Sequence, residues 1–221
     1  MKNNIVITSF AWKMAERVLL QGLAVVVQVI LARLLMPSDF AAVALINAVI
    51  HYLGLFVQSG LSTVVVQKKE LDNKDISTLM TYSLCTATLL YISIFFLAPL
   101  LSNYYNVGDL ILPIRVAALS LFLYSFNSIQ TGILSRQMRF RTIFFLSIVA
   151  MPIAAVIAIT MAFCGMGIWA LICNTLLNIL LTVIIMNTMP ELRIKLGFSF
   201  IRFKQLFSFS GKILLTTLIS G

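Results

Sequence analysis

Charged residues are scarce in this 221-residue chain, and their scarcity excludes an ordinary soluble domain. Only 10% of the residues are Asp, Glu, Lys or Arg, whereas 61% are hydrophobic. Soluble domains are roughly half apolar and about a quarter charged. A soluble globule of this length could not hide so much apolar surface from water. The sequence therefore predicts an integral membrane protein.

Residue types that carry catalysis or bind metals are also few. The chain has one His, three Cys and seven acidic residues. Cys85, Cys164 and Cys173 lie in or beside apolar runs without ligand-like spacing to His51, so we expect small apolar residues rather than a metal site or a disulfide. The patterns GxxxxGK[ST], HExxH and GxSxG are absent from the sequence, as are usefully spaced paired carboxylates. We therefore expect no enzyme, no catalytic residue, no cofactor and no ATP-driven pump within this chain.

Six long apolar runs predict the fold class, an all-α integral membrane protein with a six-helix transmembrane bundle. A spanning helix needs roughly 20 mostly apolar residues, and barrel strands would instead alternate over about 10 residues. Pro, Gly and polar residues separate the runs. The predicted spans, which together form a domain over residues 1–190, lie near 10–35, 41–66, 77–101, 111–134, 143–163 and 168–189.

Two further segments follow the sixth run. Residues 191–205 form a basic linker, and the stretch from Lys195 to Phe209 mixes Lys and Arg with Phe. This composition predicts an amphipathic helix at the cytoplasmic interface, with a plain linker as the alternative. Residues 206–221 are predicted to be the truncated start of a seventh helix.

Basic residues gather in every second connection. They flank the N-terminus and follow the second, fourth and sixth runs, and the net charge is +9. By the positive-inside rule, this alternation predicts a multi-pass membrane protein whose N-terminus and basic loops lie in the cytoplasm. Nucleic-acid binding is not expected, because the charges do not form one patch. The acidic residues of the basic loop after the second run, Glu70, Asp72 and Asp75, are expected to be solvated.

Polar side chains inside the runs recur at four, seven and eleven residues, the spacing of one helix face. Because a polar stripe facing lipid is costly, we predict that these faces line a shared hydrophilic lumen. The alternative is that the amides bond between packed helices. The lumen candidates are Arg17, Gln21 and Gln28 in the first run, Asn47, His51 and Gln58 in the second, Tyr124 and Asn127 in the fourth, and Asn174 and Asn178 in the sixth.

Two of these candidates are ionisable and have specific alternatives. Arg17 keeps its charge about one or two turns inside its run, which favours a functional role over snorkelling to the interface or pairing with Glu16. His51 is the one histidine. A satisfied interior group is the alternative to a proton relay at that position.

Four stretches of the chain resemble Wzx-type polysaccharide flippases, a branch of the multidrug, oligosaccharidyl-lipid and polysaccharide exporter superfamily. The most specific is the LARLLMPSDF stretch of residues 31–40, which is similar to the signature that opens many such proteins. Ala41 stands where the family usually has Gly. Residues 60–69, 132–141 and 206–210 resemble later family stretches.

The resemblance implies translocation of an undecaprenyl-pyrophosphate-linked oligosaccharide across the inner membrane for lipopolysaccharide or exopolysaccharide synthesis. It implies membrane lipid and lipid-linked oligosaccharide as partners, and it leaves proton or sodium coupling open. Family members are about twice as long, with two lobes, so the chain is expected to be an N-terminal half that is inactive alone. A C-terminal lobe, a second copy or polysaccharide-assembly proteins would then be partners. The alternatives are a drug or cation exporter of the same superfamily and a non-transporting membrane scaffold.

Overall fold

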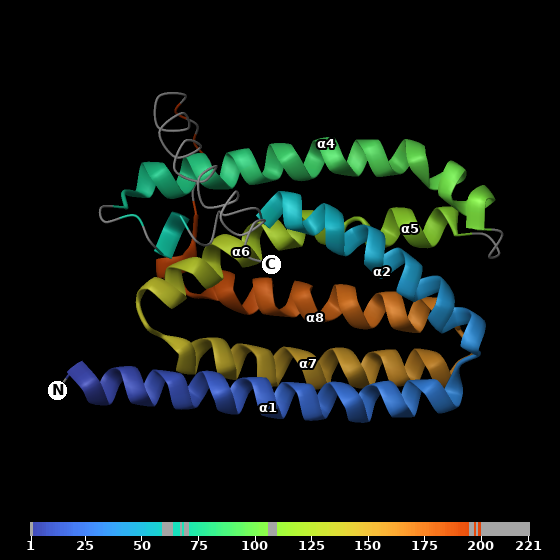
Figure 1. Cartoon of the computed structure of the whole chain (residues 1–221), viewed down its shortest axis with the longest axis horizontal. Coiled ribbons are helices and arrows are strands. Elements are labelled where there is room, and N and C mark those ends of the chain that lie inside the picture. Colours follow the sequence, from blue (N-terminus) through green and yellow to red (C-terminus); the bar gives the residue numbers. More distant parts are fainter. Residues whose placement is uncertain are drawn as a thin grey trace, which may run out of the picture.

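Every regular element in the described part of the chain is a helix. A computed structural model describes residues 2–58, 64–66, 68, 71–105, 110–194, 197 and 199, with the backbone alone for 2–11, 13, 15, 16 and 105. The elements, labelled as in Figure 1, are α1 (Lys2–Leu34), α2 (Pro37–Gln58), α4 (Asn73–Tyr105), α5 (Ile111–Ala117), α6 (Ser120–Arg136), α7 (Phe140–Phe163), α8 (Ile168–Thr188) and the short 3₁₀ helix η1 (Pro190–Leu192).

The predicted fold class is confirmed. Six helical segments are long and apolar enough to cross a membrane, and the fourth is the pair α5 and α6 taken together. Large apolar side chains face outward on them, including Phe96 at 74%, Phe163 at 71% and Val18 at 67% exposure. Such exposure would be costly in water but fits a lipid surface. The protein is therefore a multi-pass membrane protein.

The second and fourth predicted spans are each described as more than one helical segment. The described part of α2 ends at Gln58, residues 59–63 lie outside the described residues, and residues 64–66 are again helical. The fourth run is broken by a tight turn at Ala118 and Leu119 between α5 and α6. The predicted amphipathic helix and seventh helix lie outside the described residues, apart from isolated positions.

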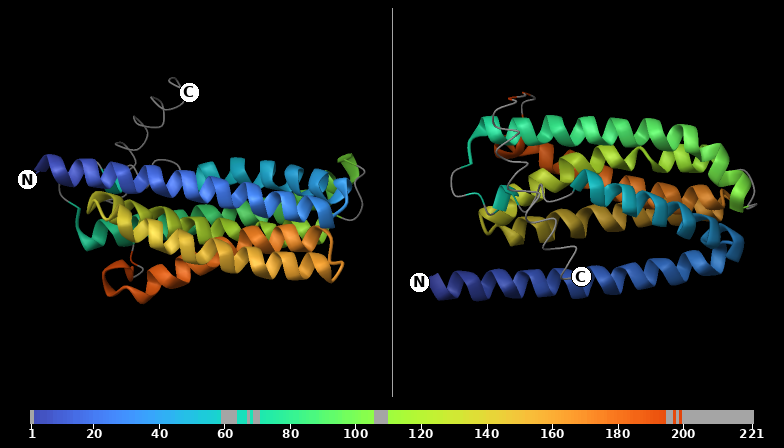
Figure 2. Two further views of the ribbon diagram at one scale, coloured as in Figure 1. Left: turned by 90° about the horizontal axis from the view of Figure 1, so that it is seen from below. Right: turned by 45° about the horizontal axis from the view of Figure 1, so that its top comes forward.

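The helices pack around α6 and α8. Helices α7 and α8 form an antiparallel hairpin, and α1 lies along α7. Helix α2 crosses α6 and α8, while α4 covers α6 on the other side of the bundle (Figure 1 and Figure 2). Helix α8 consequently contacts α2, α5, α6 and α7, which makes it the central helix of the bundle.

The α1–α2 and α7–α8 connections contact each other at one end of the bundle, through Asp39 and Gly167. Pro37 begins α2, where a missing N–H is tolerated, and Asp39 accepts a hydrogen bond from the Met36 N–H at 3.3 Å. Gly167 has a φ of +51°, and a Cβ added there would lie 3.4 Å from Asp39 Oδ1. Glycine thus meets both the backbone and the packing requirement of this contact.

A proline in the third span is coupled to an arginine in the fourth. Pro99 lies inside α4 and has no N–H to donate to the carbonyl of Phe95, four residues earlier. Arg115 of α5 donates to that carbonyl through Nη2 at 3.2 Å, and its Cζ lies 3.8 Å from the centre of the Phe95 ring. The charge of Arg115 therefore stabilises a proline-broken helix turn.

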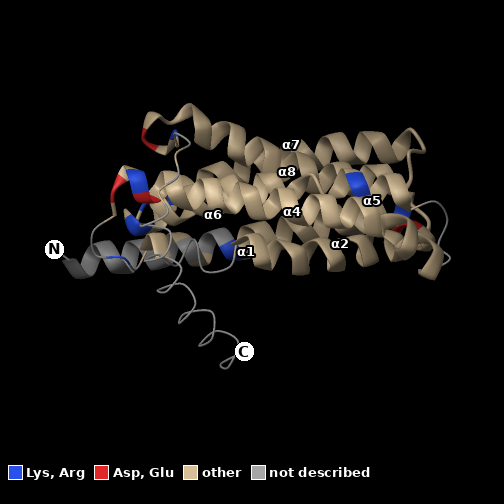
Figure 3. Ribbon diagram, turned by 90° about the horizontal axis from the view of Figure 1, so that it is seen from above, with Lys and Arg blue, Asp and Glu red and all other residues tan. Residues whose placement is uncertain are grey.

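Most of the described basic residues lie at the end of the bundle opposite the α1–α2 and α7–α8 connections. Figure 3 shows them gathered where the N-terminus lies. Lys68 pairs with Asp75 at 2.6 Å, Arg136 donates to the carbonyls of Val65 and Lys68, and Arg139 pairs with Glu191 at 2.5 Å. The expectation that the acidic residues of this loop are solvated is wrong for Asp75, whose exposed fraction is 2%. Its carboxylate accepts hydrogen bonds from Lys68 and from the Asp72 N–H, and so ties the preceding connection to the start of α4.

Candidate functional site

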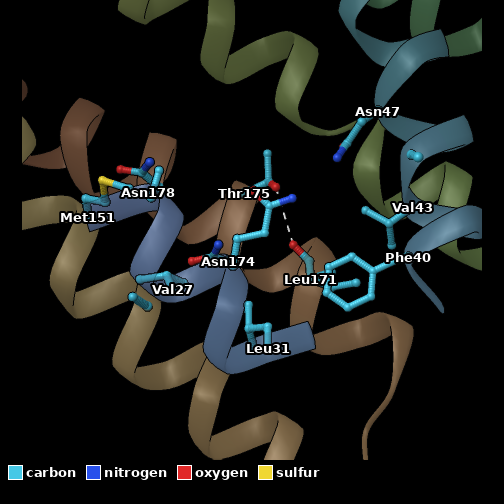
Figure 4. A pocket seen from close by; sticks show the side chains of 14 residues that line it. Val27, Leu31, Phe40, Val43, Asn47, Met151, Leu171, Asn174, Thr175 and Asn178 are labelled. Carbon is cyan, nitrogen blue, oxygen red and sulfur yellow. Dashed lines mark hydrogen bonds between the residues drawn. The ribbon is translucent and has the colours of Figure 1, made fainter. Parts of the chain in front are cut away.

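A hollow between α1 and α2 is floored by α8. Its volume is about 300 Å³, and its polar lining consists of Gln28, Asn47, Asn174, Thr175 and Asn178. In Figure 4, Asn174 and Thr175 lie between the side chains of α1 and those of α2. Apolar side chains of α1, α2, α7 and α8 complete the wall.

Two further hollows adjoin the first and share lining residues with it. One, of about 380 Å³, lies between α6, α7 and α8 and contains Tyr124, Asn127 and Asn178. The other, of about 140 Å³, lies between α2, α6 and α8 and contains Asn47, His51 and Tyr124. Thr175 lines all three hollows. We call the three together the polar groove.

The polar groove is lined by amides and hydroxyls without a fixed charge. Among the described lining residues there is no Asp, Glu, Lys or Arg, and the one histidine of the chain, His51, lines the smallest hollow. Its ring lies edge-on to Tyr52 with centroids 6.1 Å apart. Amides both donate and accept hydrogen bonds, so this wall suits a neutral, hydroxyl-rich molecule.

Seven of the ten predicted lumen residues are brought together in the groove. They come from four helices that are far apart in the sequence: Gln28, Asn47, His51, Tyr124, Asn127, Asn174 and Asn178. Arg17, Gln21 and Gln58 line none of the three hollows. Arg17 and Gln21 are exposed on α1, and Gln58 is half-buried at the end of α2.

Comparison with known proteins gives the family. The model of a family described as polysaccharide biosynthesis protein matches residues 30–220. The chain belongs to this family. The resemblance inferred from the sequence is thus confirmed at the level of a polysaccharide exporter family.

A curated relative of the chain is named as a transport protein. It is the succinoglycan biosynthesis transport protein ExoT of Rhizobium meliloti (strain 1021), which is 26% identical over 169 residues. The alignment covers 76% of this chain and 34% of the relative, so the chain spans about a third of the relative's length. No solved structure matches the chain.

Two amide side chains that bond between helices, Gln130 and Asn187, are not among the predicted lumen residues. Gln130, which is fully buried, donates through Nε2 to Asn187 Oδ1 at 2.7 Å and to the Leu192 carbonyl at 3.2 Å. By contrast, the amides of Asn174 and Asn178 make no hydrogen bond to any residue that the structure describes. Gln130 and Asn187 therefore join α6 to α8, whereas the Asn174 and Asn178 side chains have no such partner among the described residues.

Sequence reasoning missed Thr175 and the contribution of α7. Met151 of α7 lines two of the hollows and Ser147 lines one. Thr175 could have been found, since it lies three residues before Asn178 on the same helix face. Met151 and Ser147 carried no comparable signal, because α7 has no repeated amide.

We predict that Gln130→Leu lowers the thermal stability of the detergent-solubilised chain, whereas Asn178→Leu leaves it near wild type. The first change leaves Asn187 and a backbone carbonyl unpaired, at a cost of about 1–3 kcal/mol. The second removes no interhelical bond. Unfolding curves of both variants test this, and a large loss at Asn178 would assign that residue to helix packing instead.

Proposed function

We propose that this protein belongs to an exporter that moves a lipid-linked oligosaccharide from the cytoplasmic to the outer leaflet of a bacterial inner membrane. The observation that carries the proposal is the uncharged wall of amides and hydroxyls in the polar groove. Membership of a polysaccharide biosynthesis family, and a relative named for succinoglycan transport, support this substrate class.

The groove chemistry fits the physical problem of moving a sugar through a membrane. A hydroxyl that leaves water without a new hydrogen bond costs about 1–3 kcal/mol. Each side-chain amide offers one acceptor oxygen and two donor hydrogens, so Asn47, Asn174 and Asn178 would replace water around several hydroxyls. The lipid tail would stay in the bilayer while the sugar passes along α8.

The same wall disfavours a cation exporter. Intramembrane carboxylates are the expected partners of a transported cation. None of the described residues that line the polar groove is acidic. Glu16, the acidic candidate in the first span, lies outside the residues whose side chains are described.

Arg17 is the proposed partner for the pyrophosphate of the carrier lipid. Leu20 of α1 lines the groove, and Arg17 lies one turn earlier on the same helix face. At that position it would lie beyond the sugar-binding amides, towards the basic end of the bundle. A guanidinium would then offer paired, charge-assisted hydrogen bonds to phosphate oxygens.

The basic end of the bundle is proposed to face the cytoplasm, because short cytoplasmic loops are enriched in Lys and Arg. Single cysteines at Asn73 and Asn103, exposed residues near the two ends of α4, test this in a cysteine-free background. We predict that an impermeant thiol reagent labels position 103 in intact cells and position 73 after lysis. Labelling of position 73 alone in intact cells would invert the orientation.

Transport itself is tested with the complete exporter that contains this chain, expressed in cells that lack their own copy of the exporter. We predict that Asn174→Leu with Asn178→Leu lowers surface polysaccharide at least tenfold, because two hydrogen bonds of about 1 kcal/mol each are lost. Arg17→Ala should abolish display, and Arg17→Lys should restore it in part.

The matched control is Asn103→Leu, which removes an exposed amide outside the groove. It should leave both membrane abundance and surface polysaccharide unchanged. Wild-type display by the Asn174 and Asn178 double variant, at equal abundance, would contradict a sugar-binding groove and favour a scaffold role.

A further inference from the structure

A second cavity lies at the basic end of the bundle, away from the polar groove. It has a volume of about 460 Å³ and is formed by the start of α4, the end of α6, and η1 with the residues after it. Because α4 begins a span and η1 follows the end of one, the cavity lies at the level where the membrane meets water.

The cavity has a surplus of positive charge. Lys74 and Arg193 line it together with one acidic residue, Glu191. The Glu191 carboxylate is already paired with Arg139 at 2.5 Å. Arg193 donates through Nε to the Asn187 carbonyl at 3.2 Å, which anchors its guanidinium beside α8. Within the described residues, Lys74 has no acidic partner.

Part of the cavity lining is apolar. Ile76, Ile133 and Ile194 line it alongside the basic residues. A free anion would gain nothing from three isoleucines, whereas a lipid presents an anionic head group directly joined to apolar chains. Basic pockets between helices at the cytoplasmic interface are suited to such head groups.

We propose that this cavity binds the phosphate head group of an anionic phospholipid such as phosphatidylglycerol. Lys74 and Arg193 bind the phosphate, and the isoleucine wall packs against the first part of the acyl chains. The site joins the start of α4 to the segment that follows α8, so a bound lipid fixes these two elements relative to each other.

Titration of the solubilised full chain with phosphatidylglycerol, with bound lipid counted by native mass spectrometry, tests the proposal. Phosphatidylcholine and inorganic phosphate serve as comparison ligands. Lys74→Gln with Arg193→Gln should weaken phosphatidylglycerol binding roughly 30-fold, at about a factor of five per charge. Glu191→Gln should strengthen phosphatidylglycerol binding, because the change removes the acidic residue that lines the cavity and frees Arg139 from its ion pair.

The control is Arg33→Gln with Arg141→Gln, which removes the same charge outside the cavity and should leave binding unchanged. Equal loss in both double variants would show a general charge effect and overturn the site. Displacement of the lipid by millimolar inorganic phosphate would overturn the lipid assignment in favour of a free-anion site. Unchanged binding in the Lys74 and Arg193 variant would refute both.

Discussion

The constraint on which the bundle depends is the cost of an unpaired amide in a membrane. Lipid offers no hydrogen bonds, so each Asn or Gln in a span must face protein, water or cargo. Helix α8 carries Asn174 and Asn178 along one face, and it lies at the centre of the bundle, where α1, α2, α6 and α7 surround that face. The polar groove follows from this placement.

The polar residues of the spans fall into two classes, those that bond between helices and those that line the polar groove. The Gln130 amide donates to Asn187 and joins α6 to α8 near the basic end, while Arg115 supplies the donor that Pro99 cannot. These contacts hold the helices. The groove residues make no comparable contacts between helices within the described part of the chain, and a hydroxyl-rich cargo would supply the missing partners.

The sequence was sufficient for the number of spans, because apolar length is a local property. Helical spacing is local too, and seven of the ten residues that it singled out line the three hollows. It was insufficient where partners come from distant helices. Asp75 was expected to be solvated and is instead buried against Lys68. Gln130 is an amide three residues after Asn127 in the same run, so only the packing of α6 on α8 distinguishes its role from that of Asn127.

The most direct test places a small diazirine-bearing residue at position 175, which lines all three hollows. The complete exporter is then irradiated in membranes that contain radiolabelled lipid-linked oligosaccharide. We predict that position 175 captures the labelled lipid, whereas position 184, exposed on α8 outside the groove, does not. Equal capture at both positions, or capture at 184 alone, would contradict a groove that receives the sugar.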